Sequence, residues 1–143
     1  MGLKMRTKTI LTIFVSVLLI GCFTYGASSD EDMYKLASAL TKLSAAVEST
    51  VRYKDPPQNL SDDKLLEFAT RHDPGLLQSF TTYRLRVLHQ DRHAIVLVCT
   101  KDGTHALLED AGCTGELDLH LWQHEPRLAC EFTLTVAQTC TLH

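Results

Sequence analysis

Apolar residues recur every three or four positions over about residues 30–53, a spacing that places them on one face of a helix. Alanines fill much of the remainder and favour the same structure. Ser28 and Glu31 have the spacing of a capping box, so we expect a long helix that begins near residue 30. The apolar positions are Met33, Leu36, Leu40, Leu43, Val47 and Val51.

This apolar stripe has two interpretations. In the first, it packs against the sheet of its own domain, as one face of a surface helix does. In the second, it meets a partner helix or a second copy, because its spacing also fits about two or three heptads. The partner-binding residues would then be Leu36, Leu40, Leu43 and Val47.

A second, shorter helix is predicted over residues 62–72, because Ser61 is a favourable N-cap and acidic residues follow it. Leu60 and Leu65 have the spacing of a hydrophobic staple across that cap. Asp73 with Pro74 then predicts a brief helical turn that ends near residue 77, since proline suits the first helical position.

The pattern changes to strands after this turn. Residues 83–87 alternate between apolar and basic side chains, and residues 95–99 form an unbroken apolar run typical of a strand covered on both faces. Asp91 and Gly103 mark the intervening turns. We therefore expect an α+β domain in which two helices pack on an antiparallel sheet of three to five strands. The further predicted strands are residues 104–108, 117–122 and 131–136.

The beginning of the chain has the features of an export signal. Basic residues precede an apolar run over residues 9–20, which is shorter than the roughly 20 residues that a permanent transmembrane helix needs. The run ends in Leu19-Ile20-Gly21-Cys22, which resembles the lipobox of bacterial lipoproteins. An uncleaved signal anchor, in which Cys22 is incidental, is the alternative.

The resemblance implies that residues 1–21 are removed and that Cys22 carries the lipid that holds the protein on a membrane. In that family the residue after the cysteine influences sorting, and Phe23 implies the outer membrane, facing the periplasm. The expected organisation is a signal peptide (1–21), a tether (22–29) and one small domain (30–143).

Charge excludes one class of partner. The chain has 14 Lys and Arg against 17 Asp and Glu, and three of the basic residues lie in the signal. Their removal leaves 11 basic against 17 acidic residues, a formal net charge of about −6. An acidic protein has no electrostatic attraction to phosphates, so we expect no nucleic-acid partner.

Four cysteines remain beside Cys22, and an even number in an exported small domain predicts two disulfides. Three pairings are possible, and a weak preference for short loops joins Cys99 to Cys113 and Cys130 to Cys140. The alternative is a tetrahedral zinc site. Its ligands would be Cys113, His120, His124 and Cys130.

Signals of catalysis are weak. The chain contains no nucleophile elbow and no phosphate-binding glycine loop. The pair Glu109-Asp110 offers carboxylates for acid–base chemistry but is interpreted as the start of a turn. Arg84 and Arg86 are interpreted as a solvated sheet face. The remaining histidines, His72, His89, His93 and His105, are expected at the surface or in turns.

The sequence thus predicts a binding protein and not an enzyme, with no cofactor and no resident metal. We expect an accessory or scaffold component of a cell-envelope assembly that is attached through its N-terminal lipid and contacts a partner protein. The alternatives are a periplasmic enzyme or small-ligand-binding protein, with a pocket near Glu109, Asp110 and the histidines, or the zinc-binding module.

Overall fold

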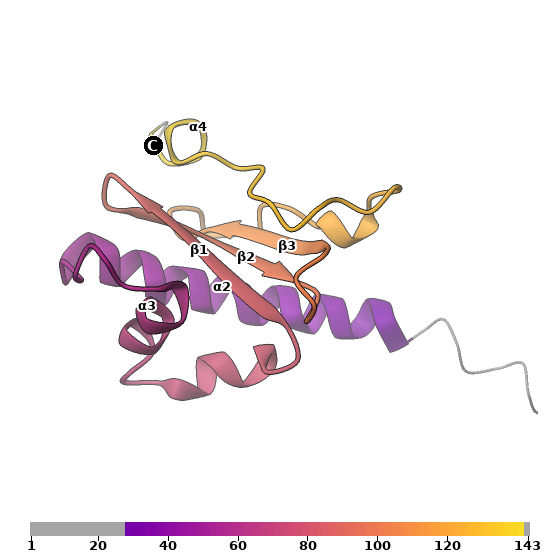
Figure 1. Cartoon of the computed structure of the whole chain (residues 1–143), viewed down its shortest axis with the longest axis horizontal. Helices are drawn as coiled ribbons and strands as arrows, with labels where there is room; N and C mark the ends of the chain where they lie inside the picture. The colour runs from indigo at the N-terminus through magenta and orange to yellow at the C-terminus, as the bar shows by residue number, and fades with distance from the viewer. Residues whose placement is uncertain (1–27, 142–143) are drawn as a thin grey trace, which may run out of the picture. The chain divides into compact units, whose positions relative to one another are not determined.

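The computed structural model describes residues 28–141 (Figure 1), and the predicted signal peptide and Cys22 lie outside this range. A long helix, a short helix and a three-stranded antiparallel sheet follow one another, which confirms the α+β fold. The elements are α2 Ser28–Tyr53, α3 Asp62–Ala69, η1 Pro74–Phe80, β1 Arg84–Gln90, β2 His93–Cys99, β3 Ala106–Ala111, η2 Leu121–Gln123 and α4 Val136–Thr139. The arrangement described below concerns residues 34–141.

The sheet has the order β1-β2-β3, so the central strand is β2 and every residue of β2 after the first is buried. Its first hairpin turns at Asp91 and Arg92, whose φ angles of 51° and 69° belong to the left-handed region that two-residue hairpins require. The Arg92 guanidinium donates to the Arg52 carbonyl oxygen at 2.5 and 3.1 Å. This contact fastens the hairpin to the end of α2.

One face of the sheet is covered by α2, which runs behind the strands in Figure 1. Ser44 on this helix donates its hydroxyl hydrogen to the Asp110 carboxylate on β3. One turn further on, Glu48 accepts the backbone N–H of Ala94 at 2.7 Å. These polar contacts fix the position of the helix along the strands.

The apolar stripe of α2 is part of the domain's own core. Leu40, Leu43 and Val47 have no exposed surface, and Leu36 is 4% exposed. The first interpretation of the stripe is therefore correct. The partner-binding role that its spacing also allowed for these four residues is corrected, because none of the four presents a surface to a partner in this fold.

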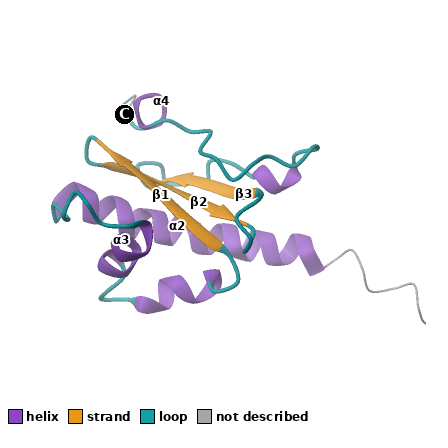
Figure 2. Cartoon of the chain, in the orientation of Figure 1, coloured by secondary structure: helices purple, strands orange, loops and turns teal. Residues whose placement is uncertain are grey.

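The other face of the sheet is covered by the segment after β3, which is mostly loop (Figure 2). Leu121 and Val136 from this segment are buried against apolar residues of β2 and β3. Two disulfides hold the segment in place, Cys99–Cys130 and Cys113–Cys140. The two expected disulfides are thus present, but the preferred pairing of sequence neighbours is wrong.

The predicted strands at residues 117–122 and 131–136 do not form. In the first, a single isolated bridge pairs Leu119 with Glu109. The bridge nearest the second pairs His105 with Ala129, two residues before its predicted start. Near the second predicted strand, the N–H groups of Thr133 and Leu134 donate to the Glu109 carboxylate instead of to a neighbouring strand. The Glu109 side chain accepts the hydrogen bonds that a neighbouring strand would have accepted, so the alternating pattern did not lead to a strand.

Candidate functional site

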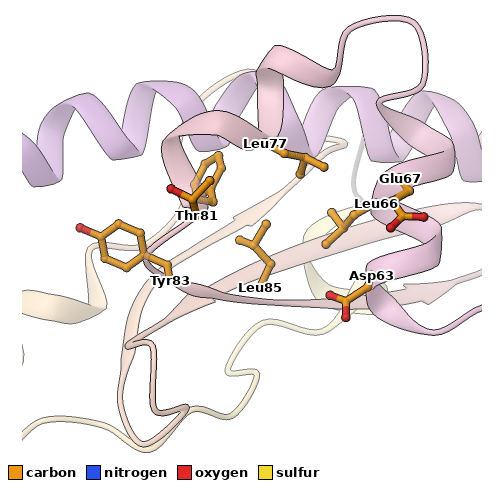
Figure 3. A pocket seen from close by; sticks show the side chains of 8 residues that line it. Asp63, Leu66, Glu67, Leu77, Thr81, Tyr83 and Leu85 are labelled. Atoms are coloured by element: carbon orange, nitrogen blue, oxygen red, sulfur yellow. The ribbon is translucent and has the colours of Figure 1, made fainter.

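A hollow of about 370 Å³ opens beside β1, between α3 and η1 (Figure 3). Leu66, Leu77 and Leu85 converge on it, one from each of these elements. Leu66 and Phe80 are buried and form its floor, while Leu77 and Leu85 are half-buried along its walls. The residues that line it are Asp63, Leu66, Glu67, Leu77, Phe80, Thr81, Tyr83 and Leu85.

The helix α3 begins where the sequence predicts. The hydroxyl oxygen of Ser61 accepts the backbone N–H of Lys64 at 3.4 Å, and two aspartates occupy the first turn, where the helix dipole favours negative charge. The helix ends at Ala69, three residues earlier than expected. There the Leu66 carbonyl oxygen accepts both the Thr70 backbone N–H at 3.0 Å and the Thr70 hydroxyl hydrogen at 2.8 Å, and Thr70 is the C-cap of the helix.

The second wall of the hollow is η1, which follows the predicted Pro74 at its first position but extends to Phe80 instead of ending near residue 77. The backbone N–H of Leu76 donates to the Asp73 carbonyl oxygen at 3.2 Å and closes its first turn. At the other end, the backbone N–H of Tyr83 donates to the Phe80 carbonyl oxygen at 3.0 Å, just before the chain enters β1. These turns aim Leu77 and Phe80 into the hollow.

The rim of the hollow is acidic. Asp63 and Glu67 are exposed on α3, four residues apart and therefore on one side of the helix. Glu67 also forms an exposed ion pair with Lys64 at 2.7 Å. Among the described residues that line this hollow, none is a histidine or cysteine. The site therefore offers apolar contact and a negative rim, and no nucleophile with an adjacent base.

The adjacent carboxylates Glu109 and Asp110 do not form a catalytic pair. They lie within β3 and not in the expected turn, and since successive strand residues point to opposite faces, their side chains are on opposite sides of the sheet. Both are buried, at 0% and 1% exposure. Each carboxylate accepts hydrogen bonds from residues packed on its own face of the sheet. The pocket that we considered around Glu109, Asp110 and the histidines is therefore not built from these two carboxylates.

Asp110 has an unusual environment. Burial raises its pKa to about 7, and the charge of the nearby Asp118 acts in the same direction. The hydrogen bond from Ser44 opposes this shift, and the Oδ1 atom of Asp110 has no hydrogen-bond partner. Asp118 itself accepts the backbone N–H of Ala111 at 2.6 Å. The carboxyl group of Asp110 is thus a source of pH dependence inside the core.

The two arginines of β1 have different surroundings. Arg84 is exposed, as the prediction of a solvated face requires. Arg86 is half-buried, because the segment after β3 covers this side of the strand: its guanidinium lies over the Phe132 ring and donates to the Cys130 carbonyl oxygen at 2.7 Å. The interpretation of Arg86 as solvated is therefore corrected.

The zinc site suggested by the sequence is not assembled. Its two cysteines belong to different disulfides, Cys113 with Cys140 and Cys130 with Cys99, so neither offers a free thiolate. Without them, His120 and His124 cannot complete a four-ligand site.

Three of the other four histidines, His89, His93 and His105, are half-buried and are not the surface or turn residues that we expected. His93 binds Glu48, with its Nδ1 atom 2.6 Å from the carboxylate, and its side chain is 17% exposed. His105 is half-buried, and its Nδ1 atom is shielded from solvent without a hydrogen-bond partner. Neither His93 nor His105 belongs to a pattern in the sequence that signals such an environment.

Within the described residues, no helix combines the length and the apolar character needed to cross a bilayer. Comparison of the chain with protein-family models, with curated proteins and with solved structures gave no match.

The hollow beside β1 was not predicted from the sequence. Its residues come from three separate segments, and each apolar residue in it also fits an ordinary amphipathic pattern. No sequence signal pointed to it, because the half-buried character of Leu77 and Leu85 depends on neighbours that the sequence does not reveal.

Proposed function

We propose that this protein is a membrane-anchored lipoprotein of the bacterial envelope that acts by binding a partner protein as an accessory or scaffold component. The attachment rests on the lipobox-like end of the signal, Leu19-Ile20-Gly21-Cys22. The lipid on Cys22 holds the domain at the membrane, with the outer membrane as the proposed location and the periplasm as the compartment.

The observation that carries the binding role is the hollow beside β1, with its apolar floor at Leu66 and Phe80 and its open walls at Leu77 and Leu85. Apolar surface that stays open to solvent costs free energy, and a partner side chain that fills it recovers this cost. Small pockets of this kind accept the anchoring residues of protein interfaces.

The rim defines the chemistry of the partner. Asp63 and Glu67 carry negative charge beside the opening, and the exported chain is acidic overall. We therefore propose a partner segment with one large apolar side chain next to lysine or arginine. Such charges raise the association rate and select the partner more than they increase affinity.

Two neighbouring leucines of η1 provide the test. Leu77 lines the hollow, whereas Leu76 is equally half-buried but is not among its lining residues. We expect Leu77→Arg to abolish cross-linking of the full-length, membrane-attached protein to the envelope protein that the unmodified chain captures. Leu76→Arg is expected to retain this cross-link, since it leaves the hollow open.

Unfolding midpoints of both variants are measured in parallel, so that a loss of folding is distinguished from a loss of binding. Equal loss of the cross-link in two folded variants, or retention of it in Leu77→Arg, contradicts the proposed docking site.

The anchor is tested separately: Cys22→Ser should block lipid labelling and leave uncut precursor in the membrane. A processed, soluble variant would show an ordinary signal peptide.

A further inference from the structure

A histidine stands beside one of the two disulfides. A ring nitrogen of His93 and the sulfur atoms of Cys113 and Cys140 all lie within 4.8 Å of one another. The three residues come from distant parts of the chain: His93 begins β2, Cys113 follows β3 and Cys140 follows α4. Tertiary structure therefore brings together one imidazole and two sulfur atoms, which are ligand types that zinc prefers.

A carboxylate, that of Glu48, holds the His93 imidazole in its orientation. Its Nδ1 atom lies 2.6 Å from the Glu48 Oε1 atom, and the other carboxylate oxygen of Glu48 accepts the Ala94 backbone N–H at 2.7 Å. Because Nδ1 is engaged by Glu48, Nε2 is the ring nitrogen left to bind a metal ion. A carboxylate that holds the far nitrogen of a histidine is the usual outer support of a zinc-binding imidazole.

The site is also sheltered. The side chain of Glu48 is 7% exposed and that of His93 is 17% exposed, and Cys140 is 6% exposed. Cys140 packs in an apolar cluster with Ile95, Ala111 and Val136. Cation binding in such surroundings requires compensating charge, which two thiolates supply because they match the charge of one divalent ion.

In the oxidised protein the two sulfur atoms are bonded to each other and are not thiolates. Tetrahedral zinc with Zn–S bonds of about 2.3 Å separates two sulfur ligands by roughly 3.8 Å. Cleavage of the disulfide and separation of the two sulfurs are therefore necessary before both cysteines can bind one metal ion together with His93. The Cys99–Cys130 disulfide has no histidine in such a cluster among the described residues.

We propose that reduction of the Cys113–Cys140 disulfide creates a zinc site formed by Cys113, Cys140 and His93, with Glu48 as its supporting carboxylate. A dithiol donor supplies two electrons and two protons and becomes a disulfide, while Cys113 and Cys140 become thiols. Binding of Zn²⁺ then releases the two thiol protons and forms two Zn–S bonds and one Zn–N bond. A water molecule completes the tetrahedron.

The site differs from the Cys113, His120, His124 and Cys130 set considered from the sequence. It is also independent of the hollow beside β1, so the two proposals can fail separately. Its consequence is a protein whose metal content follows the thiol–disulfide state of its surroundings.

Cobalt is a suitable probe, because tetrahedral Co²⁺ with thiolate ligands absorbs in the near-ultraviolet and visible regions. The full-length chain, purified in detergent, is reduced with dithiothreitol, freed of the reductant without oxygen and titrated with Co²⁺ and then Zn²⁺. We expect one Co²⁺ per reduced chain, with thiolate charge-transfer bands that Zn²⁺ abolishes. The oxidised chain is expected to bind none.

Paired variants assign the ligands. Cys99→Ser with Cys130→Ser removes the other disulfide and is expected to leave Co²⁺ binding intact, whereas Cys113→Ser with Cys140→Ser is expected to abolish it. His93→Ala should weaken binding at least tenfold and His89→Ala, in the same hairpin, should not. Glu48→Gln retains an acceptor for the Ala94 N–H and should weaken binding about tenfold.

Several results would overturn the proposal: no stoichiometric Co²⁺ in the reduced chain, equal binding by the oxidised chain, or no effect of His93→Ala. Loss of binding in the Cys99 and Cys130 variant would also overturn it, since these residues are not proposed as ligands. If reduction loosens the fold, recovery of the native circular dichroism on addition of Zn²⁺ supports the site, because the metal then binds the folded state.

Discussion

The carboxylate of Glu109 holds Thr133 by three contacts: it accepts the Thr133 backbone N–H at 3.0 and 3.1 Å and the hydroxyl hydrogen at 2.5 Å. The same carboxylate accepts the N–H of Leu134 at 3.0 Å. Glu109 is fully buried, so these bonds form away from water, where hydrogen bonds to a charged acceptor are strong. One side chain thus fixes the segment that covers the sheet.

We expect Glu109→Gln to destabilise the protein by about 2–3 kcal/mol. The amide keeps the shape of the side chain but turns an NH₂ group toward backbone donors, which leaves at least one buried N–H unpaired. The free energy of unfolding in urea measures this change. Glu131→Gln is the control, since Glu131 is exposed in the same segment, and equal stability of the two variants would contradict the role of Glu109.

Gly112 is a point of close approach between the sheet and α2. A Cβ atom at this position would lie 2.4 Å from the Ser44 carbonyl oxygen and 2.4 Å from the Glu48 Cβ atom. The Ser44 carbonyl oxygen is part of the helix backbone and cannot turn aside as a flexible side chain can. We therefore expect Gly112→Ala to lower the free energy of unfolding by about 3 kcal/mol, the upper end of overpacking costs.

Gly115 provides the matched control for this substitution. A Cβ atom there would meet nothing within 4 Å, and its φ does not lie in the left-handed region. Gly115→Ala should therefore leave the urea midpoint almost unchanged. A Gly112→Ala protein as stable as Gly115→Ala would show that α2 does not lie this close to the end of β3.

Asp110 should make stability depend on pH. Burial raises its pKa in the folded state to about 7, whereas an unfolded aspartate has a pKa of about 3.9. The folded state thus retains a proton that the unfolded state loses. The stabilisation from this group is complete below about pH 4 and is lost as pH rises toward 7, with a loss of a few kcal/mol.

The measurement compares Asp110→Asn with the unmodified protein from pH 4 to pH 8. The amide does not titrate, so we expect the variant to lose less stability over this interval and to be the more stable protein at pH 8. Glu116→Gln, at an exposed position, should follow the unmodified profile. Parallel profiles for Asp110→Asn and the unmodified protein would show that Asp110 titrates normally.

The disulfide pairing predicts a specific peptide map. Trypsin together with a glutamate-specific protease separates Cys130 from Cys140 by cutting after Glu131. Without reduction, we expect one cross-linked species that contains Cys99 and Cys130 and another that contains Cys113 and Cys140. Mass spectrometry identifies both, and a species joining Cys99 to Cys113 would contradict the structure.

The Cys99–Cys130 bond also contributes to stability. It closes 31 residues of sequence separation, and in the chain-entropy model a loop of this length is worth about 3–4 kcal/mol. Replacement of both cysteines by serine should lower the free energy of unfolding by about that amount. An unchanged urea midpoint would indicate that the bond does not constrain the unfolded chain.

The sequence by itself determined the local elements. The leucine spacing of α2, the Ser61 cap of α3 and the apolar run of β2 are each produced by neighbours within a few residues, and each was predicted correctly. The presence of two disulfides followed from the even number of cysteines. The α+β class followed from the order of the predicted elements, because helices precede strands along the chain.

Only the tertiary structure decided which residues meet across the fold. The disulfide pairing, the separation of Glu109 from Asp110 and the approach of His93 to Cys113 depend on segments that are far apart in sequence. The alternation at residues 131–136 predicted a strand, but a buried carboxylate from β3 took the N–H groups that a strand would have paired. Local patterns fix periodicity, whereas long-range hydrogen bonds and packing select among the partners that each pattern permits.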